Sequence, residues 1–135
     1  MLIEKAKTRV LVVDNERLIA DTLVLILRQN GFDATATYSG EEAVQSALAL
    51  QPDIVLTDII MGQMNGLEAA KLIADAVPHC NILLFSGQPA TADLLVQARK
   101  NGRAFEVMAK PVHPDVILEQ IKNLIAGGRS SRDLY

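Results

Sequence analysis

The 135-residue sequence has a single cysteine, no tryptophan and few aromatic residues, which make up 4% of the chain. One cysteine, Cys80, excludes a disulfide framework and a CxxC metal motif, and we interpret it as a small, buried or half-buried residue. No apolar stretch reaches about 18 residues, so we expect no segment that crosses a membrane. The N-terminus lacks the apolar region and cleavage site of a signal peptide. We therefore expect a soluble, cytoplasmic protein.

Basic residues are not in excess, because 13 Lys and Arg stand against 16 Asp and Glu, a net charge of −3. They are scattered rather than clustered, whereas nucleic-acid-binding modules usually carry a basic stripe. No GxxxxGK, GxGxxG or HExxH motif is present, which leaves an ATPase, a dinucleotide enzyme and a zinc hydrolase unsupported. Half of the residues are hydrophobic, enough for one sizeable core.

What the sequence does contain is a regular alternation of short apolar runs and longer amphipathic ones. The short runs are continuous, as in strands covered on both faces, apart from a weaker, Thr-rich run that suits an edge. The strands are expected at residues 9–13, 32–38, 53–57, 81–85 and 104–109. Helices are expected at residues 16–30, 39–50, 65–76, 90–102 and 113–127.

Residue spacing also marks the faces and ends of these helices. Ser39 and Glu42 have the spacing of a capping box, Gly31 and Gly127 are typical helix stops, and Pro114 suits a first turn. The apolar positions of the first helix recur on one face, which we expect to be buried: Ile19, Leu23, Ile26 and Leu27.

Strict alternation of strand and helix predicts a parallel sheet with right-handed crossovers and helices on both faces. Five strands suit the doubly wound order 2-1-3-4-5, so the fold class is α/β and flavodoxin-like. We expect a single domain over residues 8–127, with flexible termini at 1–7 and 128–135. In such folds functional groups collect at the carboxyl ends of the strands.

Polar side chains stand where four of the five expected strands end. Asp14 and Asn15 follow the first strand, Asp58 the third, Ser86 the fourth and Lys110 the fifth. Oxygen ligands of this kind suit Mg²⁺, a lysine suits a phosphate, and a carboxylate can act as the nucleophile that forms an acyl phosphate. Each residue alone is more typical of a helix cap, a turn or a solvated loop than of a functional site. Their joint occurrence predicts phosphoryl transfer, with Asp58 as the acceptor.

Four segments, residues 10–16, 53–69, 82–87 and 109–112, resemble the receiver domain of bacterial two-component response regulators. The resemblance extends over residues 8–127. It implies a phosphoaccepting switch in phosphorelay signal transduction that takes its phosphoryl group from a sensor histidine kinase or a phosphotransfer protein. Such a domain catalyses its own phosphorylation and dephosphorylation and is not a metabolic enzyme. The alternatives are a non-phosphorylated pseudo-receiver that binds proteins and an unrelated flavodoxin-like enzyme.

The resemblance also implies a role for each residue at the strand ends. Asp58 matches the phosphoacceptor, and Mg²⁺ is expected on Asp14, Asn15, Asp58 and the backbone carbonyl of Ile60. Lys110 matches the lysine that contacts the phosphoryl oxygens.

A hydroxyl and a proline complete this assignment. Ser86 matches the hydroxyl that binds the phosphoryl group and shifts on activation. The peptide bond before Pro111 is expected to be cis.

The sequence departs from the family pattern at several positions. Asn15 replaces the second acid of the metal pair, so Mg²⁺ should bind less tightly. Gly62 replaces a usual proline and frees the loop. Val107 replaces the switch aromatic. Ile60 and Gln88 stand where side chains help to set hydrolysis of the acyl phosphate, and the apolar Ile60 predicts slow self-dephosphorylation.

The signal is expected to leave through one face, formed by residues 91–102, 104–109 and 114–126, which we call the signalling face. A downstream protein is the expected partner, and a homodimer through this face is a second arrangement that the sequence allows. His79 and His113 are interpreted as surface or capping residues. Met1 and the short tail suggest a stand-alone regulator.

Overall fold

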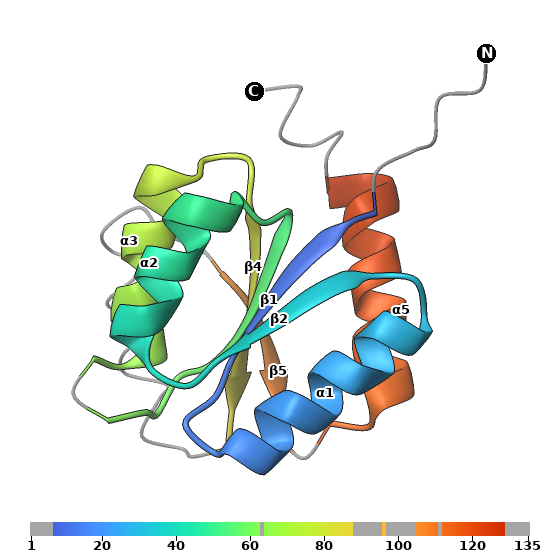
Figure 1. Cartoon of the computed structure of the whole chain (residues 1–135), viewed down its shortest axis with the longest axis horizontal. Coiled ribbons are helices and arrows are strands. Elements are labelled where there is room, and N and C mark those ends of the chain that lie inside the picture. The colour runs from blue at the N-terminus through green and yellow to red at the C-terminus, as the bar shows by residue number, and fades with distance from the viewer. Residues whose placement is uncertain (1–6, 63, 88–95, 97–104, 111, 129–135) are drawn as a thin grey trace.

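The computed structural model describes residues 7–62, 64–87, 96, 105–110 and 112–128. Its five strands form one parallel sheet in the order β2-β1-β3-β4-β5, which confirms the predicted topology (Figure 1). The elements are β1 (Arg9–Val13), α1 (Arg17–Gln29), β2 (Asp33–Thr37), α2 (Gly40–Leu50), β3 (Ile54–Asp58), α3 (Gly66–Ala76), β4 (Asn81–Ser86), β5 (Glu106–Ala109), α5 (Pro114–Asn123) and a π-helical turn (Leu124–Gly128).

Some expectations fall outside these residues. Of the helix expected at 90–102, only Val96 is described, and it is helical. The expected flexible termini lie outside the described residues except for Lys7 and Gly128. Within the described ranges, no helix is long and apolar enough to cross a membrane.

The strands match their predicted positions to within one or two residues. Asp58 and Ser86 belong to the last positions of β3 and β4, and β2 lies at an edge as predicted. The expectation that β5 is buried on both faces is wrong, because β5 is the other edge strand and Glu106, Val107 and Ala109 are exposed. Strands at an edge have a neighbour on one side alone and are covered less completely.

Helices cover both faces of the sheet, α2 and α3 on one and α1 and α5 on the other (Figure 1). Because side chains alternate along a strand, each face of the sheet contributes to its own apolar cluster. Leu11 and Val55 belong to the cluster under α2 and α3. Val12, Leu56 and Phe85 belong to the cluster under α1 and α5. The predicted burial of Cys80 is confirmed, since it belongs to the first cluster.

The buried face of α1 matches the prediction only in part, since Leu27 is buried as expected. Ala20, Val24 and Leu27 are buried, whereas Ile19 is 43% exposed and Leu23 only half-buried. The small side chains of Ala20 and Val24 let the helix approach the sheet closely. Ile19 and Leu23 therefore lie at the margin of the core rather than in it.

The ends of α1 and α2 follow the predicted signals in part. Gly31 ends α1 with a φ of +90°, a conformation that favours glycine. Ser39 accepts a hydrogen bond from the backbone N–H of Glu42 at 3.1 Å, which is half of a capping box. The second hydrogen bond of a capping box, from the backbone N–H of Ser39 to the Glu42 carboxylate, is not formed, so this part of the prediction is wrong. The Glu42 carboxylate accepts from the backbone N–H of Tyr38 instead.

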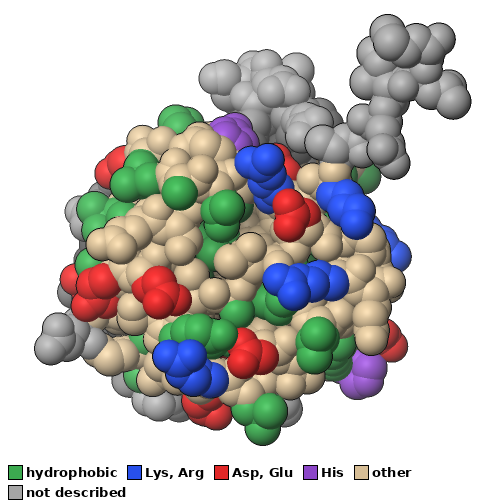
Figure 2. Space-filling model, in the orientation of Figure 1, with side chains coloured by type: hydrophobic (Ala, Val, Ile, Leu, Met, Phe, Trp, Pro, Cys, Tyr) green, Lys and Arg blue, Asp and Glu red, His purple; other side chains and the backbone are tan. Residues whose placement is uncertain are grey.

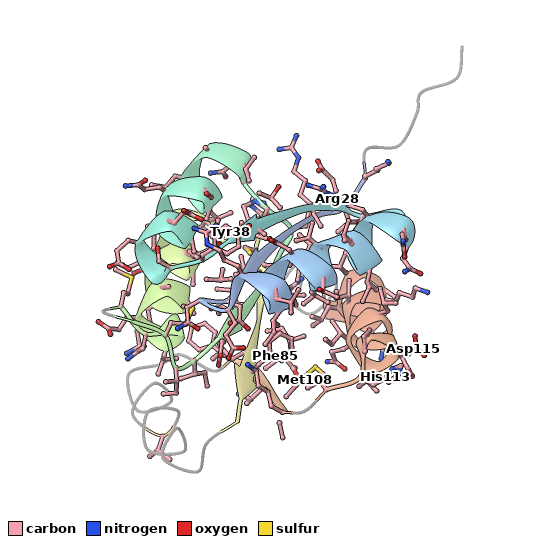
Figure 3. The ribbon with its side chains drawn as sticks, turned by 60° about the horizontal axis from the view of Figure 1, so that its bottom comes forward. Arg28, Tyr38, Phe85, Met108, His113 and Asp115 are labelled. Carbon is pink, nitrogen blue, oxygen red and sulfur yellow. The ribbon has the colours of Figure 1, made fainter. Side chains whose placement is uncertain are left out.

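The end of the chain bears out the predicted helix start. Pro114 lies in the first turn of α5, and the His113 side chain caps the helix by accepting from the backbone N–H of Asp115 at 3.1 Å (Figure 3). The helical turns continue to Gly128, one residue beyond the predicted stop.

Charged side chains of both signs are interspersed over the face that α1, β2 and α2 present (Figure 2). No continuous basic field covers this face. The view agrees with the scattered basic residues of the sequence, and nucleic acids bind to basic patches or stripes.

Candidate functional site

Asp14 and Asp58 stand at the carboxyl ends of neighbouring strands. Val13 of β1 is in register with Thr57 of β3, so the residue after each of them reaches the same end of the sheet. Asp14 is only 5% exposed, and its Oδ1 accepts a hydrogen bond from the backbone N–H of Glu16 at 2.9 Å. This bond holds the turn that leads into α1. Asp58 is half-buried.

Lys110, which follows the edge strand β5, bridges the two carboxylates. Its Nζ donates a hydrogen bond to Asp58 Oδ2 at 2.9 Å and lies 3.7 Å from Asp14 Oδ2. Because β4 separates β3 from β5, the long lysine side chain must reach across one strand to make these contacts. The fold thus brings together three of the predicted site residues.

Burial and neighbouring charges shift the pKa values in this site. Burial raises the pKa of Asp14, and the hydrogen bond from Glu16 and the charge of Lys110 offset this only in part. Burial lowers the pKa of Lys110, but the hydrogen bond and charge of Asp58 outweigh it, so the pKa is raised overall. The lysine therefore stays charged near neutral pH and balances part of the carboxylate charge.

The backbone of Asp58 packs against the start of α3. The N–H of Gly66 donates to the carbonyl oxygen of Ile59 at 2.7 Å, and a Cβ at position 66 would collide with the carbonyl oxygen of Asp58. Only glycine fits so close an approach. Asn65 and Glu68 form a full capping box at the same helix start.

Neither feature of this helix start was predicted from the sequence. The spacing of Asn65 and Glu68 is a capping signal that could have been found. Nothing in the sequence marks Gly66, since the contact depends on how α3 approaches β3.

The remaining predicted site residues are less fully defined. Asn15 is exposed beside Asp14, and Ile60 is 40% exposed two residues after Asp58. Ser86 is in register with Ala109 at the end of β4, but its side chain lies outside what the structure describes. The expectations for Gln88 and for a cis bond before Pro111 also fall on undescribed residues.

The oxygen atoms at and around Asp14 are ligands that suit a hard cation. No group of three His, Cys, Asp and Glu side chains gathers within the described parts of the chain. Two carboxylates are nevertheless enough for Mg²⁺, which completes its coordination with waters and carbonyl or amide oxygens. Asp14 Oδ2 accepts no hydrogen bond from the described residues, and Lys110 Nζ lies beyond hydrogen-bond distance. The residues present therefore fit the metal that the sequence suggested.

The protein is an open α/β domain with a doubly wound parallel sheet. Its site lies at the carboxyl ends of the strands and consists of two aspartates that a lysine bridges. The chain belongs to the response regulator receiver domain family, whose model matches residues 10–122. The expectation drawn from the sequence motifs is confirmed, and the chain is a receiver domain homologous to CheY and to response regulators.

Individual relatives give the same result. The chemotaxis protein CheY of Thermotoga maritima is 33% identical over 117 residues, covering 86% of this chain and 96% of that protein. The DNA-binding response regulator MtrA of Mycobacterium tuberculosis (strain ATCC 25618 / H37Rv) is 29% identical over 118 residues, 86% of this chain. The match covers 50% of the length of MtrA, so the chain spans about half of that protein.

A solved structure agrees on the fold. The CheY-like response regulator receiver domain protein of Methanospirillum hungatei JF-1 superposes with a TM-score of 0.84. It is 23% identical, and the match covers 93% of this chain and 99% of that one.

Proposed function

We propose that this receiver domain accepts a phosphoryl group on Asp58 from a phosphohistidine of a sensor histidine kinase or a phosphotransfer protein. The observation that carries the proposal is the 2.9 Å hydrogen bond from Lys110 Nζ to Asp58 Oδ2, with Asp14 beside it. A carboxylate that is half-buried yet open to solvent can reach a phosphorus atom, and an adjacent ammonium can receive the charge of the phosphoryl oxygens.

In the proposed reaction an Asp58 carboxylate oxygen attacks the phosphorus in line with the bond to the donor. The new O–P bond forms as the P–N bond to the donor histidine breaks, and the bonding electron pair leaves with the imidazole. Lys110 moves from the free carboxylate to a phosphoryl oxygen and keeps its charge throughout. The Ser86 hydroxyl donates a hydrogen bond to another phosphoryl oxygen. Hydrolysis of the acyl phosphate returns the domain to its starting state.

The proposed metal site uses Asp14, Asn15, Asp58 and the backbone carbonyl of Ile60. These residues would hold Mg²⁺, which would add positive charge to that of Lys110 and so help to neutralise the phosphoryl oxygens. The amide of Asn15 can offer its oxygen but no charge, which makes the proposed site weaker than one with two acidic residues at the end of β1.

The proposed output surface is the signalling face, for which β5 and α5 supply most of the described residues. Val107 on β5 and Val116 on α5 are 38% and 48% exposed, and Val96 is 51% exposed. A valine at position 107 has no ring to turn between buried and exposed states. We infer that a downstream protein, or a second copy of the chain, distinguishes phosphorylated from unphosphorylated Asp58 through this face, without an aromatic switch.

A mass measurement tests the acceptor. Intact protein is incubated with Mg²⁺ and acetyl phosphate and then weighed. One phosphoryl adduct is expected for the wild type and for Asp33→Asn, an exposed carboxylate at the start of β2. The adduct should be absent from Asp58→Asn. No adduct at saturating Mg²⁺ would favour the pseudo-receiver, an alternative to which the comparisons give no support.

A further inference from the structure

A cavity of about 550 Å³ opens between α1, α5 and the sheet, beside the acidic site. Its floor consists of Val12, Leu56 and Phe85, from three adjacent strands, all of them buried. Figure 3 shows Phe85 on the side of β4 that α1 and α5 cover. The floor is thus a continuous apolar surface within a doubly wound sheet, at the end of the sheet where such folds bind ligands.

The walls of the cavity are apolar as well. Ile19 and Leu23 of α1 form one wall, and Val112 and Ile117 form the opposite one. Ile19 remains 43% exposed because α1 packs on the sheet through Ala20 and Val24 instead. Ile19 and Leu23 thus line the hollow without filling it.

The volume and lining of this hollow are those of a ligand site rather than of a packing defect. Small-molecule sites measure about 300–1,000 Å³ and combine mostly apolar walls with a few convergent polar groups. Here the polar groups are at one end, where Asp14 and Lys110 belong to the lining.

The chemistry of that end selects a hydrogen-bond donor with positive charge. Asp14 is 5% exposed, and its Oδ2 accepts no hydrogen bond from the described residues. Lys110 is already bonded to Asp58, so it offers less to an anionic ligand than its charge suggests. Asp14, Asp58 and Lys110 together carry a formal charge of −1, and the Glu16 carboxylate adds to it.

We propose that this cavity binds a small amphipathic amine, with its ammonium on Asp14 and its apolar body between α1 and α5. Such a ligand and Mg²⁺ compete for the same carboxylate, so each weakens the binding of the other by the same factor. The consequence, inhibition of phosphorylation by the amine, rests on the proposed function. Binding of the amine does not.

Methyl-detected NMR of the metal-free wild type tests binding, with hexylamine as the probe and hexanoate as its matched anion. We expect saturable shifts of the Ile19, Leu23 and Ile117 methyls, with a Kd for hexylamine of about millimolar for so small a ligand. Hexanoate should bind at least about tenfold more weakly, roughly 1.4 kcal/mol. Equal or tighter binding of hexanoate, or no shifts at these methyls, would overturn the proposal.

Two phenylalanine variants on the same helix separate the cavity from the rest of the surface. Leu23→Phe adds volume at the cavity wall and should abolish binding, whereas Leu25→Phe adds the same ring at a position that is 58% exposed and should retain it. If Leu23→Phe does not fold, Ile19→Phe at the more exposed rim replaces it. Loss of binding in Leu25→Phe, or its retention in both cavity variants, would count against the site.

Two further titrations separate this proposal from the proposed function. Asp14→Asn should abolish the preference for hexylamine over hexanoate. An unchanged preference would show that a group other than Asp14 selects the ammonium and would contradict the proposal. Added Mg²⁺ should weaken hexylamine binding to the wild type, and independence from Mg²⁺ would overturn the competition. If the protein binds hexylamine but accepts no phosphoryl group, the proposed ligand site is supported and the proposed function is contradicted. If it is phosphorylated but does not bind hexylamine, the proposed function is supported and the ligand site is contradicted.

Discussion

The Lys110 ammonium donates a 2.9 Å hydrogen bond to Asp58 Oδ2, reaching over β4 from the neighbouring edge strand. The same nitrogen lies 3.7 Å from Asp14 Oδ2, so one cation serves two carboxylates. This arrangement gives an incoming phosphoryl group a positive charge that is already in position.

Replacement of this lysine should slow phosphorylation far more than loss of an ordinary surface charge. We expect Lys110→Met to lower the rate of phosphorylation by acetyl phosphate by about 10²-fold or more, the usual effect of removing one preorganised donor. Lys122→Met removes an exposed lysine of α5 and should leave the rate within about twofold. The rates are measured by intact mass against time, and similar rates for the two variants would exclude a phosphoryl contact by Lys110.

The packing of Gly66 against Asp58 should be intolerant of a methyl group. Gly66→Ala improves helix propensity by up to about 1 kcal/mol. Its Cβ would collide with the Asp58 carbonyl oxygen, however, and such overpacking costs about 1–3 kcal/mol. We expect a net loss of stability in urea unfolding, together with slower phosphorylation of the displaced Asp58. Gly62→Ala, where nothing lies within 4 Å of the added Cβ, is the control and should be neutral or slightly stabilising.

A second acid at the end of β1 should tighten the metal site. Asn15→Asp adds one negative charge beside Asp14, and we expect Mg²⁺ affinity to rise by about tenfold, or roughly 1.4 kcal/mol. Isothermal titration calorimetry measures both proteins at the same ionic strength. Unchanged affinity would mean that position 15 is not a ligand.

The lifetime of the acyl phosphate should depend on position 60. Ile60 is apolar and 40% exposed, so it cannot orient a water molecule for attack on the phosphorus. We expect Ile60→Asn to speed the loss of phosphate from phosphorylated protein by several-fold, about 2–10 times. Release is followed after removal of the donor, and equal rates in wild type and variant would remove the idea.

The buried carboxylate of Asp14 should make stability depend on pH in a defined direction. Because burial raises its pKa in the folded state above 3.8, the folded protein binds this proton more tightly than the unfolded chain. The wild type therefore loses stability as the pH rises from 3.8 through the folded-state pKa. We expect metal-free Asp14→Asn to be more stable than the wild type at neutral pH, with the difference shrinking on acidification.

Urea unfolding at a series of pH values measures this difference. Asp33→Asn, at an exposed position, serves as the control for the loss of a negative charge. A difference between Asp14→Asn and the wild type that stays constant with pH would show that titration of Asp14 does not contribute to it.

The order of elements and the identity of the site could be predicted because each depends on local pattern. Continuous apolar runs and helical spacing define the alternation, and parallel strands necessarily bring their carboxyl ends to one edge. Asp14, Asp58 and Lys110 could thus be assigned to one site before any contact between them was known. The sequence alone determined which residues could carry the chemistry.

Tertiary packing decided what no local pattern records. Leu27 of the predicted face of α1 is buried as expected. Ala20 and Val24 complete the buried face in place of Ile19 and Leu23, because they allow closer contact with the sheet. Likewise, the need for glycine at position 66 arises only where α3 meets the backbone of Asp58.

The division of Lys110 between two carboxylates and the cavity beside Asp14 have the same origin. Both depend on distances between elements far apart in the chain, which are set by how side chains fill the space between layers. The sequence by itself determined the fold and the reactive groups. The tertiary structure decided their distances, their burial and the space left open next to them.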